Sequence, residues 1–151
     1  MRDAVLLYER VGKVGKVILN RPQVLNALNA ELVENFGDAI RQADADPETN
    51  VIVLCAAGDK AFTAGFDLKE SIGEPIVDVP ARRENSLMEL NNWRAIWEAK
   101  KPVIASVQGY CIGGGVWMAF LSDMLIASED AKFGEPELKY SYINDVLVEP
   151  W

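Results

Sequence analysis

A predicted strand, a glycine-rich turn and a predicted helix follow one another over residues 101–121, and a junction of this kind can bind a ligand. The β-branched run 102–107 predicts the strand, consecutive glycines occupy 113–115, and the apolar run 116–121 predicts the helix. The first N–H groups of a helix have no carbonyl partner inside it and carry a partial positive charge. Because glycine has no side chain, a ligand can approach these groups closely. We expect this junction to hold an electron-rich atom of a ligand.

Two structural interpretations compete with a ligand site. The glycines could serve only to let a helix pack closely. Residues 103–121 also form a nearly uncharged run of almost membrane-spanning length, but Ser106, Gln108 and the glycines interrupt it, so we expect no membrane span. The run has neither the GxGxxG nor the GxxxxGK[ST] spacing, so a nucleotide phosphate loop is not predicted.

A second strand-to-helix junction lies further towards the N-terminus. The apolar run 51–57 predicts a strand buried on both faces of a sheet. Asp67, with Glu70 three residues later, has the spacing of a helix N-cap and its capping-box partner, so a capping role is favoured over a catalytic one. The N–H of Phe66 then stands just before a helix, next to the conformationally free Gly65.

Two converging backbone donors would form an oxyanion hole. Such a hole stabilises the enolate or tetrahedral oxygen that forms from a carbonyl, and each donor is typically worth about 2.7 to 4 kcal/mol in the transition state. The sequence predicts one donor at each junction, and convergence of the two requires the tertiary structure.

Composition narrows the classes of protein. Half of the 151 residues are hydrophobic and a quarter are charged, so we expect one soluble globular domain over 1–151. The net charge of −8 argues against a nucleic-acid partner. The absence of histidine excludes Ser-His and Cys-His pairs and histidine metal ligands, and we expect no metal site.

The cysteines and the N-terminus indicate the compartment. Cys55 and Cys111 lie in apolar surroundings without metal-binding spacing, which predicts two reduced core thiols. No signal peptide is predicted before the first strand. We therefore expect a cytoplasmic protein.

The remaining pattern predicts an α/β domain. Runs 4–10 and 14–19 predict a hairpin, 30–45 an amphipathic helix, 81–99 a long helix, and 124–127 and 131–133 short strands. One side of the long helix is expected to pack into a core or an interface through Leu87, Leu90, Trp93, Ile96 and Trp97.

Four blocks of sequence, in this order, closely resemble the crotonase, or enoyl-CoA hydratase/isomerase, superfamily. They are 20–22 with 25–28, then 62–68, then 101–105 with 109–110 and 113–115, and finally 133–137. The resemblance implies a ββα spiral core, an acyl-CoA thioester substrate, and an enolate stabilised by the N–H groups of Phe66 and Gly114. Coenzyme A is part of the substrate, so no separate cofactor is implied. The resemblance further implies a homo-oligomer, a trimer or a hexamer.

The resemblance also implies positions that contact the substrate. They are Val24, Leu25, Ala27, Ala64, Gly65, Asp67, Leu68, Tyr110, Ile112, Gly113, Trp117 and Pro136. Arg21, Lys69 and Lys101 are available for the phosphates of coenzyme A, but each is equally well interpreted as a solvated surface charge.

The catalytic positions depart from the family hydratases, which use two glutamates. The first position is Trp117 in this chain, and the second is Glu137. Water addition is easiest with two carboxylates, whereas moving a proton between two carbons needs one base of suitable pKa. We therefore expect double-bond isomerisation ahead of hydration, with Glu137 as the proton shuttle and Glu135 as the less favoured candidate. Trp117 could alternatively wall the acyl pocket.

Other activities stay open. Family members continue into a C-terminal helical part that completes the acyl pocket and supports trimer formation, whereas this chain ends shortly after Glu137, so we expect a truncated core. A non-catalytic acyl-CoA binder or truncated pseudoenzyme is one alternative. A thioester hydrolase or decarboxylase on the same scaffold is another, because these reactions share the enolate or oxyanion.

Overall fold

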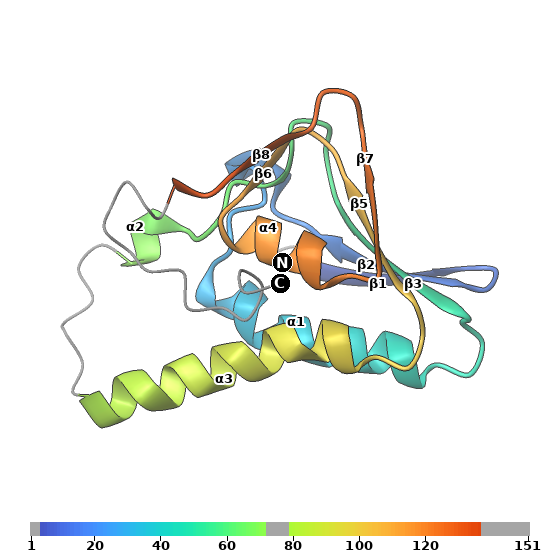
Figure 1. The fold of residues 1–151 in the computed structure, drawn as a ribbon, viewed down its shortest axis with the longest axis horizontal. Coiled ribbons are helices and arrows are strands. Elements are labelled where there is room, and N and C mark those ends of the chain that lie inside the picture. Colours follow the sequence, from blue (N-terminus) through green and yellow to red (C-terminus); the bar gives the residue numbers. More distant parts are fainter. Residues whose placement is uncertain (1–3, 72–78, 137–151) are drawn as a thin grey trace.

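The larger of two sheets forms one wall of the protein. The structure is a computed structural model that describes residues 4–71 and 79–136. The sheet has five strands in the order β1-β2-β3-β5-β7, antiparallel between β1 and β2 and parallel elsewhere (Figure 1). Its strands are β1 (Leu6–Val11), β2 (Val14–Leu19), β3 (Val51–Ala56), β5 (Val103–Val107) and β7 (Met124–Ala127). The predicted hairpin and the predicted strands near 51, 103 and 124 are confirmed.

One face of this sheet carries the hydrophobic core. Alternate residues of its inner strands are fully buried, among them Leu54 and Ala105, which pair across β3 and β5. Val51 and Val53, which point to the other face, are only half-buried. The expectation that this strand is buried on both faces is therefore wrong, because the described helices that contact the sheet, α1 (Ala30–Ala45) and α4 (Gly114–Leu121), pack with the buried residues of its other face.

A second sheet of three parallel strands stands beside the first. It has the order β4-β6-β8. Its strands are β4 (Ala61–Thr63), β6 (Tyr110–Ile112) and β8 (Lys132–Gly134). The first two were not predicted, because three residues are too few to show a period of two and their partners lie far away in the sequence. Helix α4 contacts β5 of one sheet and β6 of the other, and Figure 1 shows it between the two.

Helices α1 and α3 (Val79–Glu98) pack against each other below the sheets (Figure 1). Their backbones approach closely at Gly37, where a Cβ atom would lie 2.9 Å from the Cα of Asn92. Trp93 and Ile96 are buried beside this contact, as predicted. Leu87 and Trp97 are exposed, however, so they do not pack into the core of this chain, and their packing into an interface stays a prediction. At 3.6 residues per turn, Leu87 lies about half a turn away from Ile96.

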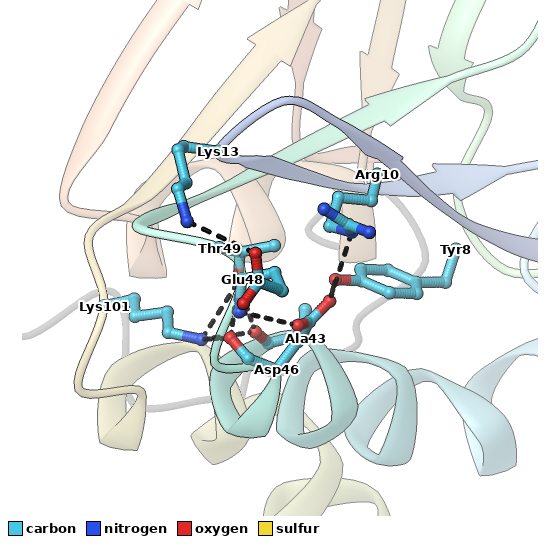
Figure 2. Close-up of polar contacts among 8 residues, drawn as sticks. All are labelled: Tyr8, Arg10, Lys13, Ala43, Asp46, Glu48, Thr49 and Lys101. Carbon is cyan, nitrogen blue, oxygen red and sulfur yellow. Dashed lines mark hydrogen bonds and ion pairs between the residues drawn. The ribbon is translucent and has the colours of Figure 1, made fainter.

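The C-terminal end of α1 is held by Lys101, which precedes β5 (Figure 2). Its Nζ donates to the carbonyl oxygens of Ala43 and Asp46, at 2.9 and 2.6 Å, and to Oγ1 of Thr49, at 2.9 Å. A cation here satisfies carbonyls that have no partner in the helix and opposes the helix dipole. Lys101 is therefore neither a solvated surface charge nor a free cation for a phosphate, and both interpretations are corrected.

Within the described residues, the longest helix, α3, is too polar to cross a bilayer, and the other helices are too short.

Candidate functional site

The two predicted donor segments meet in the structure. A Cβ atom on Gly114 would lie 2.8 Å from Cδ1 of Leu28 and 3.2 Å from Cε2 of Phe66. A Cβ atom on Gly65 would lie 3.1 Å from the carbonyl oxygen of Ile112. The loop before α2 (Leu68–Ser71) and the turn before α4 are thus in direct contact, and glycine is what permits it.

The local hydrogen bonds leave the two candidate N–H groups available. Leu28 forms an isolated parallel bridge with Phe66, in which its N–H donates to Gly65 O and its carbonyl accepts from Asp67 N. This pattern uses the groups on either side of Phe66 and not its own N–H. Gly114 is the first residue of α4. Within the described residues, 4–71 and 79–136, neither the N–H of Gly114 nor that of Phe66 donates to a backbone carbonyl.

Asp67 holds this loop by an ion pair. Its Oδ2 lies 3.0 Å from Nη1 of Arg21, and the Arg21 side chain is only 15% exposed. Its Oδ1 accepts a hydrogen bond from the N–H of Lys69 at 3.3 Å, which agrees with the predicted capping role. Arg21 also donates to Ala27 O. The two interpretations of Arg21, as a free phosphate ligand and as a solvated charge, are therefore wrong, whereas Lys69 is exposed.

Trp117 lies in a cluster of aromatic rings next to this junction. Its ring centroid is 5.6 Å from that of Phe66 and 6.3 Å from that of Trp93. Trp93 in turn packs against Phe36 at 5.4 Å. Trp117 is 6% exposed, and among the described residues the indole N–H groups of Trp93 and Trp117 have no hydrogen-bond partner. The prediction that Trp117 walls an acyl pocket stays a prediction, and its contact with Phe66 is compatible with it.

A small pocket lies between the segment 22–26 and the segment 57–61. It has a volume of about 130 Å³. The residues that line it are Pro22, Leu25, Asn26, Ala57, Gly58, Asp59, Lys60 and Ala61. Leu25 is a predicted substrate position, and its carbonyl accepts from the N–H of Ala64, another predicted position, at 2.9 Å.

Buried Asn26 shapes this pocket. It adopts a positive φ of 53°, and its Nδ2 donates to the carbonyls of Ala57 and Ala61, each at 2.9 Å. Its Oδ1 accepts from the N–H of Arg21. Sequence reasoning missed the residues 57–61 as a pocket wall. The available signal was the Gly58-Asp59 pair directly after a predicted strand, which marks a turn.

The other predicted contact positions are spread around the junction. Tyr110 is exposed on β6, with Nζ of Lys132 5.2 Å from its ring centroid. Gly113 donates to Gly134 O, and Leu68 is exposed. The remaining positions differ in exposure: Val24 is exposed, and Ala27, Ile112 and Pro136 are half-buried. Glu137, the predicted proton shuttle, lies outside the described residues.

The cysteines do not provide a nucleophile. Both are free, as predicted. Burial, with a smaller contribution from the nearby carboxylate of Glu135, raises the pKa of the Cys111 thiol to about 12. Burial also raises the pKa of Cys55. Only the thiolate is a good nucleophile, so neither residue can attack a thioester at neutral pH.

Comparisons with known proteins identify similar sequences and similar folds. The family model for enoyl-CoA hydratase/isomerase matches residues 9–151. The chain is 45% identical over 144 residues to the "Probable enoyl-CoA hydratase" of Rhizobium meliloti, covering 95% of this chain and 53% of that protein. A solved enoyl-CoA hydratase/isomerase from Xanthobacter autotrophicus Py2 is 38% identical with a TM-score of 0.84, over 90% of this chain and 50% of that one.

A further solved structure, described as an enoyl CoA hydratase/isomerase (crotonase), from Legionella pneumophila, is 36% identical, with a TM-score of 0.88 over 98% of this chain and 56% of that one. The chain thus spans about half the length of the relatives it matches. The predicted crotonase-like α/β fold is confirmed, and the chain belongs to the enoyl-CoA hydratase/isomerase family.

Proposed function

We propose that this chain binds an acyl-CoA thioester and stabilises its enolate with the N–H groups of Phe66 and Gly114. The observation that carries the proposal is the contact between their two loops, in which the hydrogen bonds of Leu28 leave the N–H of Phe66 unused. Donors fixed before the reaction stabilise a developing oxyanion without reorganisation. Membership of the family supports acyl-CoA as the substrate class.

The pocket beside Leu25 is the proposed place for part of coenzyme A. It adjoins the Phe66 loop through the hydrogen bond between Leu25 and Ala64. Lys60 on its rim supplies a positive charge that suits a phosphate, and the backbone of 57–61 supplies polar groups for an adenine. Lys60 takes the role for which Arg21 and Lys101 were considered, because both of those are engaged elsewhere. No cofactor besides the coenzyme A of the substrate is proposed.

For the chemical step we propose proton transfer by Glu137, with double-bond migration ahead of hydration. The reason is Trp117, because an indole cannot accept a proton from water as a carboxylate does. Hydration is the second candidate, since several similar proteins, including the "Short-chain-enoyl-CoA hydratase" of Clostridium acetobutylicum, carry that name. The other candidates are a binder without catalysis and a hydrolase or decarboxylase that acts through the same oxyanion. One experiment distinguishes all of them, because each reaction gives a different product and the binder gives none.

The experiment is incubation of the purified chain with 2-enoyl-CoA and 3-enoyl-CoA in deuterated water, followed by mass spectrometry. Double-bond migration with deuterium on carbon supports the isomerase, and an added water supports the hydratase. Free coenzyme A would indicate the hydrolase. The two enoyl-CoA probes have no carboxylate to lose, so malonyl-CoA is added as a third probe, and its conversion to acetyl-CoA and carbon dioxide would indicate the decarboxylase. Binding without conversion supports the non-catalytic binder, and absence of binding would overturn the proposal. Glu137→Gln should abolish migration and leave binding intact.

We further propose that the chain functions in the cytoplasm as a homo-oligomer. Support for association comes from an exposed apolar surface around the edge strand β7. It comprises Phe120, Met124, Leu125, Ile126 and Phe133. An apolar surface of this kind often marks a protein–protein interface. Two of its rings, those of Phe120 and Phe133, stack with centroids 6.5 Å apart.

A further inference from the structure

Two tryptophans beside the candidate site carry donors that bond to nothing in the described part of the chain. Nε1 of Trp93 and Nε1 of Trp117 are both buried. A buried indole N–H usually has a partner, and an exception in a folded protein calls for an explanation. Two exceptions in rings whose centroids are only 6.3 Å apart call for a common one.

The position of these rings indicates what they serve. Both pack edge-on against the ring of Phe66, Trp117 at 5.6 Å and Trp93 at 6.5 Å. Phe66 supplies one proposed donor to the thioester carbonyl, and Gly114, which supplies the other, begins the helix that carries Trp117. If a thioester carbonyl is held at this junction, as proposed above, an acyl chain that follows the ring of Phe66 would come close to the two indoles.

The chemistry of indole limits the partner to a hydrogen-bond acceptor. Indole N–H donates only, so it cannot act as a base on a water molecule. We propose that Trp117, together with Trp93, forms a donor subsite for a neutral acceptor oxygen, a ketone or hydroxyl, on the acyl chain of the substrate. This inference rests on the proposed function and narrows it to acyl-CoA thioesters with an oxygen beyond the thioester carbonyl.

The burial of the two indoles favours a neutral oxygen over a carboxylate. Trp93 is 1% exposed and Trp117 is 6% exposed, and both pack against the ring of Phe66. An ionised carboxylate loses far more hydration free energy than a ketone or hydroxyl oxygen when it enters apolar surroundings of this kind.

A purely structural explanation also exists and makes a different prediction. The planes of the Trp93 and Trp117 rings are inclined at 84°, so an N–H of one ring can point at the face of another. Such N–H···π contacts are weak but recurrent. They would satisfy the indole N–H groups without a ligand. An added oxygen on the acyl chain would then not change the binding affinity.

The test compares matched acyl-CoA probes by calorimetry. Hexanoyl-CoA provides the reference, the 3-oxo and 5-oxo derivatives each add one neutral acceptor, and adipoyl-CoA adds a carboxylate. We expect the wild type to bind at least one oxo derivative about fivefold more tightly than hexanoyl-CoA. Trp117→Phe keeps an aromatic ring but removes the N–H donor. In this variant the ratio of the affinities for the oxo derivative and for hexanoyl-CoA should fall to about one. Trp97→Phe is the matched control, because Trp97 is 56% exposed and should leave the preference unchanged.

A second measurement follows the donors directly. In NMR spectra of a chain with ¹⁵N-labelled indoles, the chemical shift of the Trp117 indole N–H should change when the oxo derivative is added. It should not change when hexanoyl-CoA is added. Equal binding of hexanoyl-CoA and both oxo derivatives, or a preference that survives in Trp117→Phe, would overturn the subsite while the proposed function stands. Tighter binding of adipoyl-CoA would overturn the neutral acceptor. If hexanoyl-CoA does not bind either, the proposed function fails together with the subsite.

Discussion

The ring of Phe66 lies against the backbone of Gly114, so close that a Cβ atom on Gly114 would be 3.2 Å from Cε2 of that ring. These residues are far apart in the sequence: Phe66 lies in the loop before α2, and Gly114 is the first residue of α4. Their contact brings together the two backbone segments that each offer an N–H group at the candidate site.

Gly114→Ala should weaken recognition of the thioester carbonyl. The added methyl group would lie 2.8 Å from Cδ1 of Leu28 and must displace Leu28 and Phe66. We expect a stability loss of about 1 kcal/mol and a drop of about fivefold in the preference for a CoA thioester over the matching thioether, which lacks the carbonyl. Calorimetry with both ligands measures the preference.

The control is Gly134→Ala, whose added methyl would meet only the end of a flexible side chain, Cδ1 of Ile112, at 3.2 Å. It should retain the thioester preference. An unchanged preference in Gly114→Ala would contradict the idea that close packing at Gly114 positions its N–H for the carbonyl.

The Arg21–Asp67 ion pair should stabilise the Phe66 loop. Its side chains are 15% and 14% exposed, so removing one charge leaves the other poorly solvated. We expect Asp67→Asn to lower the free energy of unfolding by about 1 to 3 kcal/mol. A double-mutant cycle with Arg21→Met, followed by urea unfolding, isolates the pair. Additive effects of the two substitutions would show that the pair contributes nothing of its own.

Lys101→Met should destabilise the protein, because three acceptors around the end of α1 lose their shared donor. We expect a loss of about 1 to 3 kcal/mol in the free energy of unfolding. The neighbouring Lys100→Met serves as control, since the described contact of Lys100 uses its backbone N–H, which donates to Asp44. Equal losses in the two variants would argue against the capping role.

Asp46 should make the free energy of unfolding depend on pH in the acid range. The hydrogen bond from the Tyr8 hydroxyl, at 2.7 Å, lowers the pKa of the Asp46 carboxyl (Figure 2). A carboxyl with a lowered pKa in the folded state adds stability above its unfolded pKa and loses it as the pH falls through the folded value. The difference in unfolding free energy between wild type and Asp46→Asn should therefore be largest near neutrality and shrink below about pH 4. Tyr8→Phe should reduce this pH-dependent part, and a difference that stays constant with pH would contradict the assignment.

The apolar surface at β7 should drive self-association. Ile126 is 58% exposed on the edge strand, so Ile126→Lys should shift the chain towards the monomer with little loss of stability. Sedimentation at several concentrations measures this shift. As a control, Val11→Lys places the same charge on the other edge strand, β1, where Val11 is 56% exposed. A monomer at all concentrations in the wild type would refute the homo-oligomer.

Several features of this protein were determined by local sequence. Helix α1 begins after Asn29, whose side chain accepts from the N–H of Leu32, and its apolar spacing predicted its full length. The inner strands β2 and β5 were equally clear, because alternation or a β-branched run persists over several residues. The order of the four sequence blocks was sufficient to predict the family.

Tertiary structure decided the rest, because the deciding interactions join distant parts of the chain. The strands β4 and β6 exist through pairing with each other, and Arg21 became an internal ion-pair partner only because Asp67 folds back to it. Likewise, the sequence shows Trp117 only as a member of an apolar run. The tertiary structure packs it against Phe66 and Trp93 and leaves its N–H without a partner in the described residues. Spacing along a chain encodes helices and strands, whereas burial and pairing of charges depend on which segments meet.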